Sequence, residues 1–484
     1  MKLNNPELLR SQCLINGEWC DALSGKREAV INPATGAELA SIPLVSEEET
    51  QQAIAAAQRA QNDWKQLTAK QRSALLLAWT DKVLAAQEDL AQLMTAEQGK
   101  SLAEARGEVA YAASFITWFA EEAKRVDGAV LQAPQASQRL VVVKQPIGVC
   151  AAITPWNFPA AMITRKVAPA LAAGCAIIVK PAEQTPLTAL ALAKLAQDAG
   201  IPAGVLQVVT GEAAQVGKVL CDSPVVRKLS FTGSTEVGRI LMAQCAPSIK
   251  KLSLELGGNA PVIVFDDANL DAAVAGIMAS KFRNSGQTCV CANRIYVQDG
   301  IYERLAEKLV AAVEQLKVGD GSQEGTTQGP LIDSDAVAKV QSHIDDALIK
   351  GAQIATGGQP HALGGTFFQP TVVTGVTHKM RFAKEETFGP VAPLFRFHDE
   401  AEAIAMANDT EFGLAAYLFT QNAARQWRVP EALEYGMVGI NTGLISNEVA
   451  PFGGVKQSGL GREGSRYGIE EYLELKYLCI DVSR

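Results

Sequence analysis

The chain has 484 residues and a formal net charge of −8, from 44 Lys and Arg against 52 Asp and Glu. Its 48% apolar content allows a large packed core and excludes a disordered chain, and its length favours about three domains. The acidic balance argues against general nucleic-acid binding, which needs a basic surface, and four histidines leave little material for a multi-histidine metal site. We therefore expect no nucleic-acid partner and no bound metal.

The nine cysteines are scattered along the chain, with no CxxC motif and no paired framework. This usage is typical of a reducing compartment. The N-terminal residues show neither a long apolar segment nor an arginine-rich, acid-poor stretch, and no uncharged apolar run is long enough to cross a membrane. We expect a cytoplasmic protein without membrane contacts.

The first part of the chain is helical in pattern, since apolar residues recur every three or four positions over residues 47–125. Residues 139–145 alternate instead, which predicts a strand outside the core, either a hairpin or an arm between subunits. From residue 146 short apolar strands alternate with helices, a pattern typical of βαβ units and a parallel sheet. The helices predicted here are one that ends near residue 173 and three more over 186–199, 212–222 and 235–246.

A second unit of alternating strands and helices begins at the apolar strand 260–265. Helices are predicted over 269–284 and 302–316, separated by the strand RIYVQD. The closing stretch, 470–482, alternates again and predicts a further pairing strand. The fold class expected from this order is α/β.

Cys289 is the strongest candidate nucleophile. It lies in FRNSGQTCVC, a polar, glycine-containing turn directly after a helix, where a thiol gains little from burial. No histidine lies near it, which argues against a Cys–His hydrolase pair. Glu255 ends an apolar strand and precedes Gly257 and Gly258, where the backbone must turn or approach another segment closely. A carboxylate in such a place can have a raised pKa and act as a base for water.

Asn157 is a candidate for stabilising an oxyanion. It lies in PWNFP, after a predicted core strand, where two prolines fix the turn and the side-chain amide is a potential donor. The segment GLGREG matches the GxGxxG pattern, but it follows a glycine-rich loop rather than a buried strand. We therefore do not assign it to dinucleotide binding.

Seven segments together carry a resemblance that covers nearly the whole chain. In this order and spacing, the chain resembles the aldehyde dehydrogenase superfamily, and within it is most similar to succinate-semialdehyde dehydrogenases. The segments are PWNFP, KPAEQTP, FTGSTEVG, LELGG, FRNSGQTC, EETFGP and PFGGVKQSGLGREG.

The resemblance implies an α/β fold with three parts. A Rossmann-like cofactor domain would comprise residues 1–125 and 147–256, and a catalytic α/β domain would comprise 257–465. A β-arm for oligomerisation would comprise 126–146 and 466–484. It further implies a homo-oligomer, either a dimer or a dimer of dimers.

The resemblance also implies a reaction, the NAD(P)-dependent oxidation of succinate semialdehyde to succinate. Cys289 would attack the aldehyde carbon, and the Asn157 side chain and the Cys289 backbone N–H would hold the oxyanion. After hydride transfer to the nicotinamide, Glu255 would activate the water that hydrolyses the thioester. Glutarate semialdehyde or another aldehyde remains an alternative substrate. A Cys-dependent hydrolase and a non-catalytic binding protein remain more distant alternatives.

Eight residues are implied to bind the dinucleotide, and one of them bears on the choice of cofactor. Glu183 can accept both hydroxyls of an adenosine ribose but repels a 2′-phosphate, so we expect NAD to be preferred over NADP. The other seven are Trp156 and Lys180 at the adenosine ribose, Gly233 and Ser234 at the pyrophosphate, Glu386 and Phe388 at the nicotinamide ribose, and Leu256 at the nicotinamide.

Two arginines are implied to bind the substrate's carboxylate. Arg165 follows Asn157 and Arg283 precedes Cys289, and an arginine pair can hold a carboxylate in bidentate fashion. Ser446 would add a hydroxyl to the same group. Cys291 would form a reversible disulfide with Cys289, although it is equally expected as a packing residue.

Overall fold

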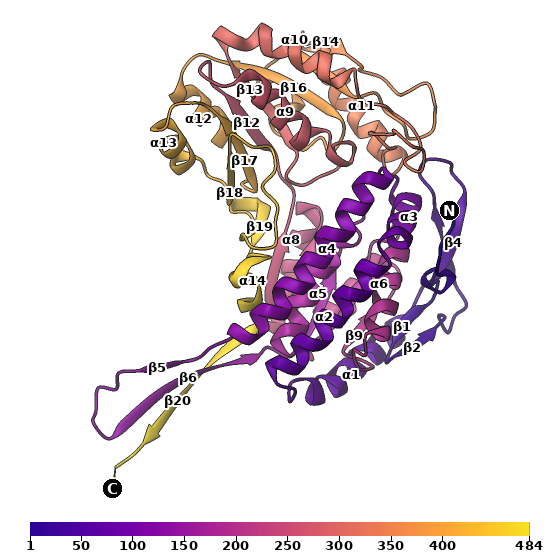
Figure 1. Cartoon of the computed structure of the whole chain (residues 1–484), viewed down its shortest axis with the longest axis vertical. Helices are drawn as coiled ribbons and strands as arrows, with labels where there is room; N and C mark the ends of the chain where they lie inside the picture. The colour runs from indigo at the N-terminus through magenta and orange to yellow at the C-terminus, as the bar shows by residue number, and fades with distance from the viewer. Residues whose placement is uncertain (484) are drawn as a thin grey trace.

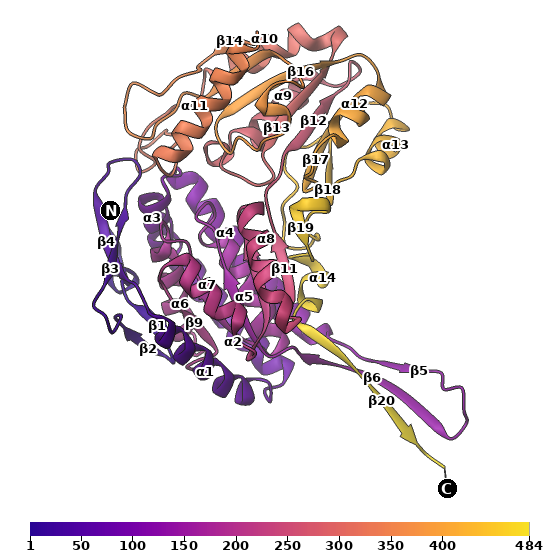
Figure 2. The same ribbon diagram turned by 180° about the vertical axis from the view of Figure 1, so that it is seen from behind.

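The computed structural model describes residues 1–483 as two α/β units joined side by side, with a thin β-arm that projects from one of them (Figures 1 and 2). The C-terminus lies at the tip of this arm (Figure 1). No helix among these residues is both long and apolar enough to cross a membrane.

The first unit is built on an eight-stranded sheet, in which five neighbouring strands, β11, β10, β7, β8 and β9, run parallel. β7 and β8, near the centre of the sheet, have near-continuous apolar sequences, which fits strands that are buried on both faces. In spatial order the strands are β19 (Gly459–Leu460), β11 (Lys251–Glu255), β10 (Val226–Thr232), β7 (Val149–Ile153), β8 (Ala176–Lys180), β9 (Leu206–Val208), β1 (Cys13–Ile15) and β2 (Glu18–Cys20).

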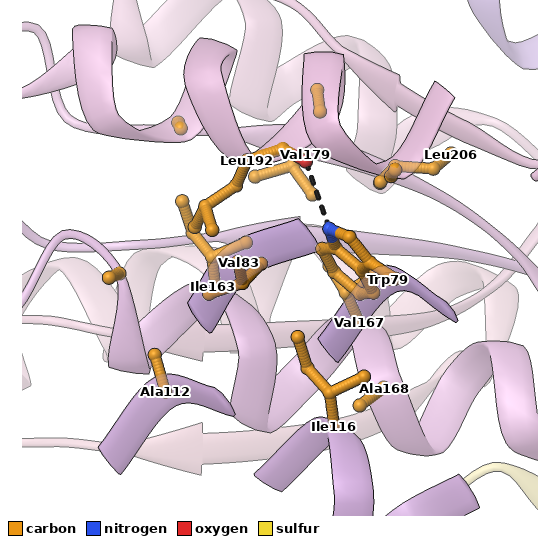
Figure 3. Packing of buried hydrophobic residues seen from close by; sticks show 14 of the residues in the cluster. Trp79, Val83, Ala112, Ile116, Ile163, Val167, Ala168, Val179, Leu192 and Leu206 are labelled. Carbon is orange, nitrogen blue, oxygen red and sulfur yellow. Dashed lines mark hydrogen bonds between the residues drawn. The ribbon is translucent and has the colours of Figure 1, made fainter. Parts of the chain in front are cut away.

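Eight helices surround this sheet (Figures 1 and 2). Trp79 of α2 shows how they pack: its indole is fully buried among residues of neighbouring elements, and its N–H donates to the Leu192 carbonyl at 3.1 Å (Figure 3). The helices are α1 (Glu47–Trp64), α2 (Ala69–Ala85), α3 (Gln87–Gln98), α4 (Leu102–Glu122), α5 (Ala161–Ala173), α6 (Pro186–Asp198), α7 (Ala213–Asp222) and α8 (Thr235–Cys245).

The second unit is built on a seven-stranded sheet that is parallel except for its edge strand β14. In order its strands are β14 (Gln353–Thr356), β15 (Thr371–Val376), β16 (Val391–Phe397), β13 (Ala292–Gln298), β12 (Ala260–Val264), β17 (Ala415–Phe419) and β18 (Met437–Ile440). Its helices are α9 (Leu270–Lys281), α10 (Tyr302–Val313), α11 (Ser334–Ile349), α12 (Glu400–Asn408) and α13 (Arg425–Ala432).

The arm is an antiparallel sheet of three strands from distant parts of the chain, in the order β20 (Leu473–Asp481), β6 (Gln138–Pro146) and β5 (Ala129–Leu131). The helix α14 (Ser465–Glu470) leads into it, and a separate hairpin joins β3 (Arg27–Ile31) and β4 (Glu38–Pro43). Seven short 3-10 helices complete the described elements: η1 (Pro6–Leu8), η2 (Ala123–Arg125), η3 (Ala246–Ser248), η4 (Arg283–Gly286), η5 (Asp299–Ile301), η6 (Arg381–Ala383) and η7 (Lys456–Ser458).

The α/β class and the alternating elements predicted from the sequence are confirmed. The isolated strand 139–145 is the centre of β6, and it pairs with the closing strand along its whole length, from Leu473 opposite Pro146 to Asp481 opposite Gln138. The segment GLGREG begins with β19, where a Cβ on Gly459 would lie 1.8 Å from the Leu254 carbonyl oxygen. This glycine therefore allows close pairing with β11. The boundaries of the three functional parts stay predictions.

Candidate active site

The candidate catalytic residues lie where the two sheets face each other. Asn157 follows β7, and Glu255 is the last residue of the neighbouring strand β11. The carboxyl ends of parallel strands lie at one edge of a sheet, which is where ligands of open α/β sheets bind. Cys289 comes from the other unit, on the loop before β13. Asn157 and Cys289 line one cavity together, so both units contribute to it, whereas Glu255 is not among its lining residues.

The loop that carries Cys289 has an unusual backbone. Asn284 and Ser285, in η4, have φ values of 51° and 55°, in the left-handed region that non-glycine residues seldom adopt. A Cβ on Gly258 would lie only 2.5 Å from the Cys289 carbonyl oxygen. The predicted close approach at the glycine pair is therefore confirmed at Gly258, and its partner is the backbone of the nucleophile's own loop.

Asn157 is held against this loop by hydrogen bonds. It is 4% exposed, and its side-chain amide donates to the Gln287 carbonyl at 3.0 Å. Its own carbonyl accepts from the Asn284 amide at 2.9 Å and from the Lys100 ammonium at 2.8 Å. Because a primary amide has two N–H groups, the second remains for an oxyanion beside Cys289.

A buried ion pair fixes the segment around Asn157. The Lys100 ammonium hydrogen-bonds the Glu108 carboxylate, and both side chains are almost completely buried. The other oxygen of Glu108 accepts from the backbone N–H groups of Ala160 at 2.9 Å and Ala161 at 3.2 Å, at the start of α5. Neither residue was predicted from the sequence. Lys100 lies in the loop after α3 and Glu108 on α4, and both are buried, where an unpaired charge is costly.

The Cys289 thiol is strongly biased toward its protonated form. Burial raises its pKa to about 12, while the Arg165 guanidinium opposes the shift and the Glu386 and Glu255 carboxylates add to it. The thiolate is the reactive form. The nucleophile in this state therefore needs a proton acceptor or a change in its surroundings before it attacks.

Glu255 has the environment of a general base. It is 3% exposed, and its Oε2 has no hydrogen-bond partner among residues 1–483. Burial raises its pKa well above the usual range, with added repulsion from Glu463, and Arg165 and Lys166 oppose the shift. A carboxyl group with a raised pKa can accept and release a proton near neutral pH.

Arg165 is already paired in this structure. Its Nη2 lies 2.8 Å from Glu463 Oε2, and the same carboxylate accepts a hydrogen bond from Lys166. The guanidinium also lies over the rings of Phe452, at 3.9 Å, and Phe115, at 5.5 Å. Glu463 was not predicted as a site residue, because it lies 297 positions from Lys166 in the sequence.

A narrow cavity of about 20 Å³ opens beside Cys289 and contains all three predicted substrate residues. Unlike Arg165, Arg283 has no hydrogen bond or ion pair to any of residues 1–483, and its guanidinium lies 4.8 Å over the Phe158 ring. The lining residues are Tyr111, Phe158, Met162, Arg165, Arg283, Thr288, Cys289, Val290, Ser446 and Phe452. We refer to it as the acid-side cavity.

A larger cavity of about 280 Å³ lies on the other side of Cys289, and we refer to it as the cofactor-side cavity. It brings six of the eight predicted cofactor residues together with Cys289 and Asn157. These six are Trp156, Gly233, Ser234, Leu256, Glu386 and Phe388.

The walls of the cofactor-side cavity fit a nicotinamide dinucleotide. Ser234 caps α8 by accepting from the Val237 N–H at 3.3 Å, so the helix N-terminus with its free N–H groups faces the cavity, as a pyrophosphate requires. Trp156 and Phe388 meet edge to face, with centroids 5.6 Å apart, and supply an apolar wall. Glu386 accepts from the Gly258 N–H at 3.1 Å, and burial raises its pKa to about 7.

Comparison with known proteins agrees with this arrangement. A model of the aldehyde dehydrogenase family matches residues 19–478. The chain belongs to the aldehyde dehydrogenase family. It is an oxidoreductase that acts on aldehydes with a nicotinamide dinucleotide.

Three relatives illustrate how far the similarity extends. This aldehyde dehydrogenase is 65% identical to the NADP(+) succinate-semialdehyde dehydrogenase of Escherichia coli K12 over 99% of this chain and 100% of that one. It is 64% identical to the glutarate-semialdehyde dehydrogenase of Pseudomonas putida over 100% of both chains. The crystal structure of succinate-semialdehyde dehydrogenase from Burkholderia pseudomallei is 64% identical, covers 100% of both chains and superposes with a TM-score of 0.99.

Two predicted cofactor residues of this aldehyde dehydrogenase lie outside the cofactor-side cavity. Lys180, which is 2% exposed, forms an ion pair with Glu183. Glu183 lines a separate cavity of about 560 Å³, between the β3–β4 hairpin and the segment 363–366. The two cavities share Ile332 and Asp333 in their walls, so Glu183 lies beyond one end of the cofactor-side cavity.

One further side chain of the cofactor-side cavity was not predicted. Lys339 of α11 lines it, and its charge opposes the raised pKa of Glu386. Its helix carries several exposed charged residues, and the sequence pattern does not distinguish this one from the others.

Proposed function

We propose that this aldehyde dehydrogenase oxidises succinate semialdehyde to succinate. The observation that carries the proposal is the unpaired Arg283 guanidinium on the wall of the acid-side cavity, which begins at Cys289. Arg283 and Cys289 line the same cavity, so we place the acid group of a short aldehyde at Arg283 and its carbonyl carbon at Cys289; Ser446 adds a hydroxyl to the same wall. The names of the relatives from Escherichia coli and Burkholderia pseudomallei support the four-carbon substrate.

In the first chemical step, the Cys289 sulfur attacks the aldehyde carbon. The carbonyl oxygen becomes an oxyanion, and we assign its two donors to the second N–H of the Asn157 amide and the backbone N–H of Cys289. This gives a thiohemiacetal on Cys289. The dinucleotide, when bound, supplies the acceptor for the hydride that the thiohemiacetal loses.

In the second step, the thioester on Cys289 is hydrolysed. We assign Glu255 as the base that takes a proton from the attacking water, consistent with its raised pKa and its free Oε2. The carboxylic acid then leaves and the thiol is restored. Splitting the oxidation into two steps at one sulfur avoids a single difficult reaction.

The substrate is tested by comparing aldehydes that differ in one feature. We expect kcat/KM to be highest for succinate semialdehyde, lower for glutarate semialdehyde and much lower for butanal, which has the same chain length without the acid group. The measurement is the rate of cofactor reduction. A higher value for glutarate semialdehyde favours the alternative substrate named for the Pseudomonas putida relative, and equal values for butanal contradict acid recognition.

We also propose NAD as the preferred cofactor. Glu183 lies beyond one end of the cofactor-side cavity, where we place the adenosine ribose, and its carboxylate would repel a 2′-phosphate. The ion pair with Lys180 supports a fixed orientation of this carboxylate. The test is kcat/KM for NAD and NADP in the native protein and in Glu183→Ser, which we expect to shift the ratio toward NADP. A native preference for NADP, as in the name of the Escherichia coli relative, contradicts the proposal.

We further propose a cytoplasmic homo-oligomer, a dimer or a dimer of dimers, and the exposed arm supports the oligomer. Several large apolar residues of β20 and β5 face solvent in the single chain, which is unusual unless another surface covers them. They include Val130, Leu475, Tyr477 and Ile480. The mass in solution by light scattering tests this, and a monomer at micromolar concentration contradicts it.

Finally, we propose that Cys291 forms a reversible disulfide with Cys289, which blocks the nucleophile. Cys291 lies two residues after Cys289 and is 1% exposed. Its S–H donates a hydrogen bond to the Lys281 carbonyl at 3.1 Å. A peroxide would oxidise the two thiols to one disulfide and be reduced to water. We expect dithiothreitol to reverse peroxide inactivation in the native protein but not in Cys291→Ala, and identical behaviour contradicts the switch.

A further inference from the structure

Tyr111 of α4 carries a buried hydroxyl that has no hydrogen-bond partner among residues 1–483. Burial of an unpaired hydroxyl costs free energy, so such groups call for an explanation. Four other buried tyrosines in this protein donate to backbone carbonyls. These tyrosines are Tyr296, Tyr302, Tyr417 and Tyr435, which donate to the carbonyls of Met406, Leu394, Val290 and Ala407.

The Tyr111 side chain lines the acid-side cavity with Arg283, Ser446 and Cys289. Its ring is fixed by an edge-to-face contact with Phe115, with centroids 4.9 Å apart and planes at 72°. The cavity is about 20 Å³, enough for roughly one water molecule. An acid group that enters such a space contacts the walls directly, because no water layer fits between them.

An acid group in this cavity needs more donors than Arg283 alone supplies. A carboxylate has two oxygens that together accept about four hydrogen bonds. Arg165 is held by Glu463 and lies over Phe452, and the Thr288 hydroxyl contacts the Arg283 carbonyl at 3.5 Å. Among the polar groups on the cavity wall, Arg283, Ser446 and Tyr111 remain without partners in residues 1–483. Arg165 Nε also lacks a hydrogen-bond partner there, although Arg165 Nη2 lies beside Glu463.

We propose that Tyr111 is a further substrate-binding residue, whose hydroxyl donates a hydrogen bond to the acid group of the aldehyde beside Arg283. This inference rests on the proposed oxidation of an acid-bearing aldehyde. Burial raises the pKa of Tyr111, with Arg165 and Arg283 opposing the shift, so the hydroxyl remains protonated and able to donate.

The test is Tyr111→Phe, which removes only the hydroxyl. We expect kcat/KM for succinate semialdehyde to fall about tenfold or more, mainly through KM, as for the loss of one hydrogen bond to a charged group. For butanal we expect no change. Because the hydroxyl has no partner in the free protein, the melting temperature should not fall.

Tyr302→Phe is the matched control. Its hydroxyl donates to the Leu394 carbonyl at 3.1 Å and accepts from the Gly375 N–H at 3.0 Å, and it lies in the second unit outside both cavities. We expect a lower melting temperature and an unchanged ratio of kcat/KM between the two aldehydes. The pair of variants therefore separates substrate binding from a structural role.

Two results overturn the inference. Unchanged kcat/KM for both aldehydes in Tyr111→Phe shows that the hydroxyl does not contact the acid group. An equal fall of kcat/KM for both aldehydes shows a structural role. Arg283→Ala distinguishes these outcomes from a failure of the proposed function. If Arg283→Ala lowers kcat/KM for succinate semialdehyde but not for butanal, only the role of Tyr111 is wrong. If it lowers kcat/KM for both aldehydes equally, acid recognition in this cavity is itself wrong.

Discussion

The two cavities that Cys289 lines differ in which polar groups of their walls lack a partner. On the cofactor side, Ser234 and Glu386 have backbone hydrogen-bond partners, whereas the side-chain oxygens of Thr232 and Asn157 have none among residues 1–483. On the acid side, the Arg283 guanidinium and the Tyr111 hydroxyl have no partner among residues 1–483. Unpaired polar groups are costly, so they mark the place where a ligand completes the structure. The unpaired groups of the acid side include hydrogen-bond donors, as an acid group requires, and we propose that the substrate is selected there.

The largest effect is expected for Cys289→Ala, which changes the one predicted catalytic residue that lines both cavities. Without the sulfur no covalent intermediate forms, so we expect kcat to fall by about 10⁴-fold or more with every aldehyde. Dinucleotide binding, measured by quenching of protein fluorescence, should persist with its Kd changed less than about twofold. Loss of dinucleotide binding would show that the two sides are not independent.

Glu255→Gln should separate the two chemical steps. The variant keeps the shape of the side chain but cannot take a proton from water, so we expect turnover to fall about 100- to 1000-fold. Because the oxidation step precedes hydrolysis, rapid mixing should show a burst of one reduced cofactor per subunit followed by slow turnover. A slow reaction without a burst would assign Glu255 to the first step.

The two arginines provide the sharpest test of the comparison. We expect Arg283→Ala to raise KM for succinate semialdehyde about 10- to 100-fold and to leave butanal nearly unaffected. Arg165→Ala should instead lower the melting temperature and impair both substrates alike, because it leaves the buried Glu463 with fewer compensating charges. If Arg165→Ala instead lost activity with succinate semialdehyde but not with butanal, the substrate would displace Glu463 from this arginine.

The smallest effect concerns the pH dependence of the nucleophile. With the pKa of Cys289 raised to about 12, the thiolate fraction of the free protein is small at neutral pH and grows with pH. We expect the rate of alkylation by iodoacetamide to rise about tenfold from pH 7 to pH 8 and to keep rising above pH 9. Cys289→Ala serves as the control for the other cysteines, and a plateau below pH 9 would contradict the raised pKa.

Much of the fold could be predicted because its signals are local. The helix over Pro186–Asp198 and the strand over Gln138–Pro146 follow from the spacing of apolar residues within each segment. Glu255 could be singled out as an acid at the end of an apolar strand before two glycines, and Cys289 as a thiol in a polar, glycine-containing turn. Lys100 and Glu463 could not, since each has meaning only through a partner 57 or 297 positions away.

The sequence by itself determined the α/β class, the family resemblance and the identity of the three predicted catalytic residues. Only the tertiary structure decided which charges are free. Arg165 and Arg283 look equivalent in the sequence, but one is 1% exposed and paired with Glu463, and the other faces a cavity without a partner. The physical reason is that apolar periodicity depends on neighbours in the chain, whereas the state of a charge or a hydroxyl depends on neighbours in space.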